Sequence, residues 1–250
     1  MLTRPMPSKA MLLAAGTGTR LQPLTHDISK CMVPIGGRPI LEHNIEALRN
    51  FGVTDLIVNL HHLSESVSNY FGNGEKWGVR LSYSFEQELL GTAGAVKKNE
   101  EFFDGPFFVW YGDNLSTIRL DRLWALHHEK HATATIALFH RPDPTNSGIV
   151  AIDNNNRITR FLEKPRTDQI FSNWVNAGIL VLEKDVLERI PAGVVIDFGR
   201  DVLPDLVNVG GPVYGYHMSP DECLWWIDTL ADLERVQAAL HVTRFGQGQP

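Results

Sequence analysis

Residues 10–21 read AMLLAAGTGTRL, and this stretch decides the fold class. The apolar run at 10–15 is short and leads directly into a glycine loop, which is typical of a buried parallel strand rather than a helix. Gly16 and Gly18 carry no side chain, so the backbone amides beside them can approach a phosphate closely. An ordinary tight turn after a buried strand is the alternative that the glycines alone leave open.

The segments that follow alternate between helical and strand-like patterns. Apolar residues recur at helical spacing over 40–50, with Pro39 at the start and Gly52 just past the end. Strands are predicted at 55–60, 79–85 and 107–110, and helices at about 64–70 and 92–98. This alternation predicts a mostly parallel sheet covered on both faces, with ligands at the carboxyl ends of its strands.

The pattern changes after residue 120. Strand-like runs at 131–139, 148–152 and 158–161 are separated by turn residues, which predicts an inserted antiparallel section that forms a pocket wall. Strand character returns at 179–182 and 213–215, and residues 231–240 predict a closing helix. The expected fold is therefore α/β: a three-layer, Rossmann-like domain with a mostly parallel central sheet and an inserted antiparallel section.

The composition is that of a globular protein, with 43% hydrophobic residues and a net charge of -6. A negative chain argues against nonspecific nucleic-acid or membrane binding, because both need a basic surface. Cys31 and Cys223 are too few for a disulfide framework or a zinc site. The apolar run after Lys9 is shorter than a signal-peptide core, and no run approaches the roughly 18 to 20 residues of a membrane span. We expect a cytoplasmic protein with no membrane or nucleic-acid partner.

Arg20 and Lys30 are the cations of the loop that follows the first strand. A guanidinium makes bidentate phosphate contacts and an ammonium adds a mobile charge, so the pair suits a polyphosphate. A solvated surface pair is the alternative. A dinucleotide fingerprint would need a third glycine where Leu21 stands, and a P-loop would need Gly-Lys-Ser/Thr. The glycine spacing therefore disfavours a dehydrogenase.

Short blocks of sequence occur in order along nearly the whole chain. They are LAAGTGTRL at 13–21, Lys30-x-Met32-x-Pro34, RPIL at 38–41, LGTAGA at 90–95, Gly112-Asp113, Phe161-x-Glu163-Lys164-Pro165, Asn176-Ala177-Gly178 and Trp226-Ile227-Asp228. Together they resemble the signature of the sugar-1-phosphate nucleotidyltransferases, and within that family the mannose-1-phosphate guanylyltransferases resemble them most. The resemblance implies an enzyme that joins a nucleoside triphosphate to a sugar 1-phosphate and releases pyrophosphate. We expect one domain over 1–250, with a nucleotide-binding part at about 8–120 and a sugar-phosphate-binding part at about 121–230.

The resemblance also implies roles for individual residues. Arg20 and Lys30 would hold the triphosphate, and Lys164 the attacking sugar phosphate. Asp113 and Asp228 would bind Mg²⁺, a cation that prefers hard oxygen ligands. Further nucleotide contacts are implied for Leu13, Ala15, Gly16, Gly18, Thr19, Gly91 and Thr92, and sugar contacts for Gly148, Glu163, Asn176 and Gly178.

Some of these assignments have structural alternatives. An aspartate after a strand, as Asp113 is, can equally cap a turn. Glu163 and Lys164 are adjacent in a strand-like run, so their side chains face opposite ways unless the pleat is disturbed before Pro165. They would then form only a surface charge pair. Thr-Leu at 229–230 stands where the family usually has glycine, which affects the geometry around the second aspartate.

Glu86 lies at the end of a predicted strand, shortly before Gly91. In uridylyl and thymidylyl relatives, the position that resembles it is a glutamine that reads the base. Uracil and thymine present one N–H between two carbonyls, which suits an amide, whereas guanine presents two adjacent donors, which suit an acceptor-only carboxylate. Glu86 therefore favours GTP, and an exposed strand-end glutamate is the alternative.

Other functions stay open at the level of sequence. One is thymidylyl or uridylyl transfer to glucose 1-phosphate or another sugar phosphate. Another is a catalytically silent homologue that binds a nucleotide sugar and regulates a partner subunit, although the retained Arg20, Lys30, Asp113, Lys164 and Asp228 argue against it. The identity of the sugar and the oligomeric state, including a homo-oligomer, also stay open.

Overall fold

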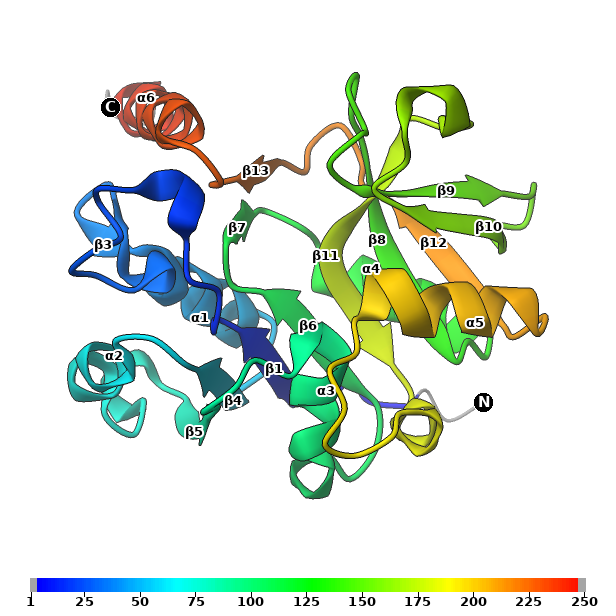
Figure 1. Cartoon of the computed structure of the whole chain (residues 1–250), viewed down its shortest axis with the longest axis horizontal. Helices are drawn as coiled ribbons and strands as arrows, with labels where there is room; N and C mark the ends of the chain where they lie inside the picture. Colours follow the sequence, from blue (N-terminus) through cyan, green and yellow to red (C-terminus); the bar gives the residue numbers. More distant parts are fainter. Residues whose placement is uncertain (1–3, 247–250) are drawn as a thin grey trace.

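The strand predicted from residues 10–15 lies in the middle of the main sheet as β1 (Lys9–Leu13). It pairs in parallel with β4 (Asp55–Leu60) on one side and with β6 (Phe107–Tyr111) on the other. The computed structural model describes residues 4–246, so the ends of the predicted domain, 1–3 and 247–250, lie outside the described residues. Figure 1 shows β1 at the centre of the fold.

The described chain alternates strands and helices as the sequence predicts. Its other strands are β2 (Pro34–Ile35), β3 (Arg38–Pro39), β5 (Arg80–Phe85), β7 (Asn114–Ser116), β8 (Ala134–His140), β9 (Gly148–Ile152), β10 (Ile158–Glu163), β11 (Trp174–Leu182), β12 (Val213–His217) and β13 (Leu224–Trp226). Its helices are α1 (Ile40–Asn50), α2 (Ser64–Phe71), α3 (Gly91–Lys98), α4 (Leu120–Glu129), α5 (Leu203–Asn208) and α6 (Leu230–Gly246). Within residues 4–246, none of the helices combines the length and the apolar character that crossing a membrane requires.

The main sheet is mixed and has a parallel centre. Its strand order is β10-β9-β11-β6-β1-β4-β5, and β8 joins β12 to β11 beside this path. Strands β6, β1, β4 and β5 are parallel, and β11 runs antiparallel to β6. The inserted section is antiparallel as predicted, since β8 and β9 both pair antiparallel with β11 and β9 pairs antiparallel with β10, whereas the later strand β12 pairs in parallel with β8. Strand β12 lies outside that section, because the chain passes through α5 before it forms β12.

Two apolar clusters cover opposite faces of the sheet. Side chains alternate between the faces of a strand. Accordingly, Ala10 and Leu12 pack with α1, α2 and α4, whereas Met11 packs with α3 and α5. The domain therefore has helix, sheet and helix layers, as predicted from the sequence.

Helix α4 was not predicted, although it carries the expected spacing. Leu120, Leu123 and Trp124 are buried on one side of it. Helix α4 ends at Glu129, and His131 just beyond it has a φ of 47°, in the left-handed region. The strand predicted from 131 therefore begins only at Ala134.

The C-terminal helix α6 lies beside the N-terminal loops (Figure 1). Leu233 and Val236 of α6 share an apolar cluster with Leu21, which follows the glycine loop, and with Ile227. Because Ile227 directly precedes Asp228, this packing holds Asp228 against the loop that follows β1.

Candidate active site

Two adjoining pockets open at the carboxyl ends of β1 and β6, the edge at which ligands were expected. The first pocket, of about 360 Å³, lies between the glycine loop and the start of α3. The second, of about 470 Å³, lies against β9, β10 and β11. Both are lined by Arg20, Thr92, Tyr111, Asp113, Asp197 and Asp228. A ligand that fills both pockets would thus pass over one shared set of polar side chains, four of which are charged.

The glycine loop lines the first pocket as predicted. Its lining residues are Leu13, Ala15, Gly16, Gly18, Thr19 and Arg20. Gly18 has a φ of 65° and accepts a hydrogen bond from Thr25 Oγ1 at 2.7 Å. A Cβ at Gly18 would lie 3.0 Å from Lys30 Cβ. Glycine at this position therefore lets the Lys30 side chain pass close to the loop.

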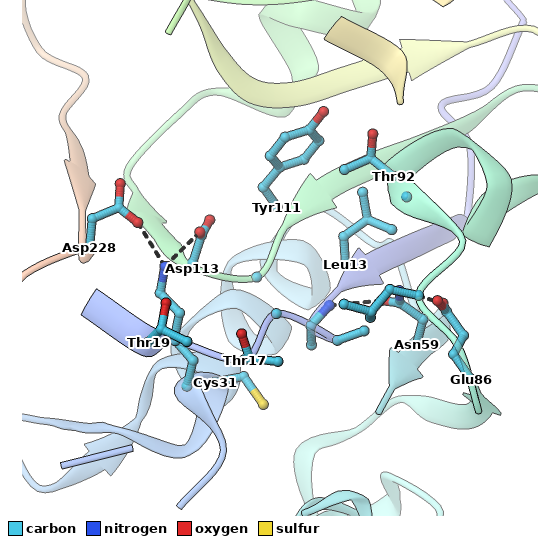
Figure 2. Close-up of a pocket in the computed structure, with 18 of the residues that line it drawn as sticks. Leu13, Thr17, Thr19, Cys31, Asn59, Glu86, Thr92, Tyr111, Asp113 and Asp228 are labelled. Atoms are coloured by element: carbon cyan, nitrogen blue, oxygen red, sulfur yellow. Dashed lines mark hydrogen bonds and ion pairs between the residues drawn. The ribbon is translucent and has the colours of Figure 1, made fainter. Parts of the chain in front are cut away.

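Lys30 connects the two aspartates that the sequence pairs as metal ligands. Its Nζ donates to Asp113 Oδ2 and to Asp228 Oδ1, both at 2.8 Å. Arg20 also pairs with Asp228 Oδ1, at 2.9 Å. Burial lowers the pKa of Lys30, but the two carboxylates outweigh burial and raise it overall. Asp113 and Asp228 point toward one ammonium group, which stays charged (Figure 2).

The path of the chain brings these aspartates together. Asp113 lies in the turn between β6 and β7, and β7 pairs with β13, which ends two residues before Asp228. The turn needs glycine at 112, because a Cβ there would lie 2.9 Å from the Leu13 carbonyl oxygen that accepts the Gly112 N–H.

The paired aspartates fit the donor chemistry of Mg²⁺. Asp113 Oδ1 and Asp228 Oδ2 have no hydrogen-bond partner among residues 4–246, so each carboxylate keeps an oxygen for a ligand. The same residues contain no group of three or more His, Cys, Asp or Glu side chains arranged to hold a metal. Mg²⁺ commonly takes one or two carboxylates together with phosphates and waters, so two aspartates are sufficient.

In the second pocket, the Glu163 carboxylate is enclosed by two glycines. A Cβ at Gly148 would lie 2.6 Å from Glu163 Oε2, and a Cβ at Gly199 would lie within 2.4 Å of the same oxygen. Across residues 4–246, no hydrogen bond or ion pair engages this carboxylate, and burial raises its pKa. Glu163 is half-buried, so a ligand that displaces water from this carboxylate has to supply hydrogen-bond donors in its place.

Lys164 disturbs the strand after Glu163. Its φ of 46° lies in the left-handed region, and its backbone N–H donates to the Ser147 carbonyl at 3.1 Å. Glu163 and Lys164 therefore both line the second pocket, and do not face opposite ways as in a regular strand. The Lys164 ammonium has no hydrogen-bond or ion-pair partner in the described part of the chain, which leaves it free for an anion.

Asn176 and Gly178 also line the second pocket, where β11 is irregular. The register against β8 shifts between Asn176 and Leu180, and Asn176 Oδ1 accepts the Gly178 N–H at 2.9 Å. Gly178 has a φ of 72°, and a Cβ there would lie 2.7 Å from Asn114 Nδ2. Strand β11 begins at Trp174, five residues before the predicted start at 179. The prediction is short because Asn-Ala-Gly at 176–178 interrupts the apolar pattern, although the strand continues through it with an irregular register.

Asp197 and Tyr111 line both pockets and were not predicted. Asp197 Oδ1 accepts the Thr92 N–H at 3.0 Å and the Thr92 hydroxyl at 3.1 Å. Gly91 lines the first pocket but is also needed for packing, because a Cβ there would lie 2.5 Å from the Ile196 carbonyl oxygen. Both donors of Thr92 are therefore hydrogen-bonded to Asp197. The sequence around Asp197 contains no pattern from which this contact could be predicted.

Glu86 is only 5% exposed and lines the first pocket, so the alternative of an exposed strand-end glutamate is wrong. Its Oε1 accepts from Asn59 Nδ2 at 2.8 Å and its Oε2 from the Leu90 N–H at 3.0 Å. Figure 2 shows Asn59 and Glu86 together at the end of the pocket remote from Asp228. Asn59 was missed, although a polar residue inside the apolar strand DLIVNL is a usable signal.

Comparisons with known proteins identify relatives of this chain. The chain is 40% identical over 234 residues to a UTP–glucose-1-phosphate uridylyltransferase from Synechocystis, covering 88% of this chain and 59% of the relative. It is 34% identical over 212 residues to a mannose-1-phosphate guanylyltransferase from Mycobacterium tuberculosis, covering 83% and 58%. The chain thus spans somewhat more than half the length of these curated relatives.

The fold is also found among solved structures. UDP-glucose pyrophosphorylase complexed with UDP-glucose matches with a TM-score of 0.83 and 20% identity, covering 96% of this chain and all of the other. At that identity the likeness concerns the fold. A family model described as nucleotidyl transferase matches residues 9–240. On this match and the sequence identities, the chain belongs to the nucleotidyl transferase family.

Proposed function

We propose that this protein is a sugar-1-phosphate nucleotidyltransferase that makes a GDP-sugar and pyrophosphate from GTP and mannose 1-phosphate or a related hexose or heptose phosphate. The observation that carries the proposal is the shared wall of the two pockets, where Arg20, Asp113 and Asp228 lie and where Lys30, from the first pocket, pairs with both aspartates. The named relatives include a uridylyl and a guanylyl transferase, so the choice of GTP rests on Glu86.

The reaction needs no protein nucleophile. An oxygen of the sugar phosphate attacks the α-phosphorus, and the bond from that phosphorus to the oxygen bridging to the β-phosphate breaks as pyrophosphate leaves. Arg20 and Lys30 would neutralise the triphosphate along the shared wall, and Lys164 would hold the attacking phosphate in the second pocket. Alignment of the two substrates and neutralisation of their charge then supply the catalysis.

Asp113 and Asp228 would hold Mg²⁺ through the oxygens that Lys30 does not engage. When bound, the ion would neutralise charge on the phosphates. Lys30 keeps the two carboxylates compensated at all stages, because their proximity holds its pKa high.

In the second pocket, Glu163 would accept hydrogen bonds from sugar hydroxyls, with Asn176, Gly148 and Gly178 shaping the site. The proposed parts at about 8–120 and 121–230 meet at the two pockets, because each part contributes residues that line both: Arg20, Thr92, Tyr111 and Asp113 from the first, and Asp197 and Asp228 from the second.

The direct test is a pyrophosphate-release assay with GTP, UTP, dTTP, ATP and CTP against mannose, glucose and heptose 1-phosphates. We expect the highest turnover with GTP. Thermal stabilisation by a nucleotide sugar without turnover on any pair would contradict the proposal and favour the silent regulatory homologue.

Lys164→Ala is expected to raise the KM for the sugar 1-phosphate by about 10- to 100-fold, because a hydrogen bond to a charged group contributes about 1.5–3 kcal/mol. The KM for GTP should change little, since Lys164 lines only the second pocket. Steady-state kinetics with each substrate varied in turn measures both values. Lys184→Ala, at an exposed lysine outside both pockets, is the control. A loss confined to GTP would mean that Lys164 serves the triphosphate.

Glu163→Gln is expected to raise the Tm at pH 7 while lowering turnover. The pKa of Glu163 is raised by burial, so ionisation of this carboxyl is less favourable in the folded state than in the unfolded state and lowers stability at pH 7. This cost grows as pH rises from the ordinary carboxyl range through the raised pKa, and it vanishes below that range, where the wild-type side chain is protonated. Thermal unfolding at pH 7 and at about pH 4 should therefore show a difference only at pH 7. Glu188→Gln, at an exposed glutamate, should show none; equal Tm values at pH 7 would refute the prediction.

A further inference from the structure

Asn59 connects the glycine loop to the proposed base-reading residue. It lies on β4, is only 4% exposed and lines the first pocket. Its Oδ1 accepts the Ala14 N–H at 2.8 Å, and its Nδ2 donates to Glu86 Oε1 at 2.8 Å. One amide thereby joins the end of β1 to the end of β5.

The orientation of this amide follows from its surroundings. The Ala14 N–H can only donate, so the Asn59 atom that faces it must be the oxygen, and the NH₂ group must then face Glu86. The other oxygen of Glu86 faces a second fixed donor, the Leu90 N–H. Both neighbours of the side chain at position 86 are therefore donors, and the two carboxylate oxygens of Glu86 accept from them both.

The backbone at position 86 is held as well. The Glu86 N–H donates to the Leu60 carbonyl at 2.8 Å, and Nδ1 of His61 donates to the Glu86 carbonyl at 2.8 Å. The side chain thus starts from a fixed point and ends between two fixed donors. The hydrogen-bonding groups that the side chain at position 86 turns toward the pocket can therefore be changed by substituting Glu86 or Asn59.

We propose that Asn59 is a specificity-determining positioning residue: it holds Glu86 with both carboxylate oxygens facing donors, as an acceptor-only group, and so selects guanine over uracil and thymine. The inference rests on the proposed function. Each carboxylate oxygen has a second lone pair beyond the bond to Asn59 or Leu90, so Glu86 can still accept the two adjacent N–H donors of guanine. A uracil carbonyl would meet an acceptor there and remain unpaired, which disfavours that base.

The experiment is a double-mutant cycle of Asn59→Asp, Glu86→Gln and the double variant. Asn59→Asp keeps an acceptor for the Ala14 N–H but turns a carboxylate toward Glu86. Glu86→Gln sets its NH₂ against either the Asn59 NH₂ or the Leu90 N–H. In the double variant the new amide donates to the new carboxylate at position 59 and accepts the Leu90 N–H, so the bonding pattern is complete again, with an amide at the base-reading position.

We expect each single variant to lower the Tm and to reduce the GTP to UTP ratio of kcat/KM by at least about 10-fold, which equals about 1.4 kcal/mol. The double variant should recover the wild-type Tm and yet prefer UTP or dTTP over GTP. Asn154→Asp and Glu88→Gln are matched controls, because both residues are exposed and line neither pocket. Both controls should leave the GTP to UTP ratio of kcat/KM unchanged. They show whether adding or removing one negative charge on the protein alters that ratio without any change in the first pocket.

Calorimetric titration with GTP and UTP measures base selection from binding alone, as the ratio of the two dissociation constants. Failure of all substrate pairs to release pyrophosphate would therefore refute the proposed function, while binding still tests Asn59. The inference is overturned if the wild-type protein binds UTP in preference to GTP, if Asn59→Asp keeps the wild-type ratio, or if the Tm losses of the two single variants add in the double variant.

Discussion

Asp113→Asn and Asp228→Asn are each expected to lower kcat on the order of 10²- to 10³-fold, the size of effect seen when a group that stabilises transition-state charge is removed. Each substitution removes one of the two carboxylates that would hold Mg²⁺ beside the phosphates. The Tm should change little, because asparagine keeps an oxygen for Lys30 and the second aspartate stays in place.

The measurement is kcat at saturating Mg²⁺ and saturating substrates, with thermal unfolding alongside. Asp104→Asn is the matched control, since Asp104 is exposed, pairs with Lys9 at 2.8 Å and lines neither pocket. The control should keep wild-type turnover. Turnover near the wild-type value in both Asp113→Asn and Asp228→Asn would refute the metal assignment, whereas a large loss of Tm would mean that the aspartates serve the fold.

The parts of the fold that were predicted are those that short-range patterns determine. Strand 55–60, strand 148–152 and helix 40–50 have the predicted bounds, because each is a periodic or continuous apolar run that turn residues delimit. The glycine loop follows β1 as predicted, and Gly18 adopts the left-handed conformation that glycine permits. The pairing of Asp113 with Asp228 came only from the family resemblance, since a strand pair, β7 with β13, brings them together.

What the sequence could not show depends on contacts between distant segments. Asp197 reaches both pockets because residues 194–197 pack on the start of α3, where Gly91 and Gly94 leave room for the carbonyls of Ile196 and Val194. In the sequence these two glycines resemble ligand-binding glycines. In the structure the absence of a side chain at each of them lets residues 194–197 pack against α3. The free oxygens of Asp113 and Asp228, one on each carboxylate, and the bond from Asn59 to Glu86 likewise become visible only when the strands are aligned.

Lys30→Met is expected to lower kcat on the order of 10²- to 10³-fold and to increase the effect of Mg²⁺ on stability. Lys30 is the cation that both Asp113 and Asp228 share, and their charge raises its pKa, so it remains an ammonium at assay pH. Without it, the two carboxylates repel each other and only Arg20 compensates Asp228. The Tm without Mg²⁺ should therefore fall, and added Mg²⁺ should raise it more than in the wild type.

Lys164→Met supplies the contrast, because it also removes a cation from the site but leaves Asp113 and Asp228 paired with Lys30. Thermal unfolding with and without Mg²⁺ should show a wild-type Mg²⁺ shift for Lys164→Met and a larger one for Lys30→Met. If the two variants respond equally to Mg²⁺, the ion does not bind at the carboxylates that Lys30 engages. Lys30 would then act on the triphosphate alone, and the metal ligands would have to be sought elsewhere along the shared wall, with Asp197 the next carboxylate that both pockets contact.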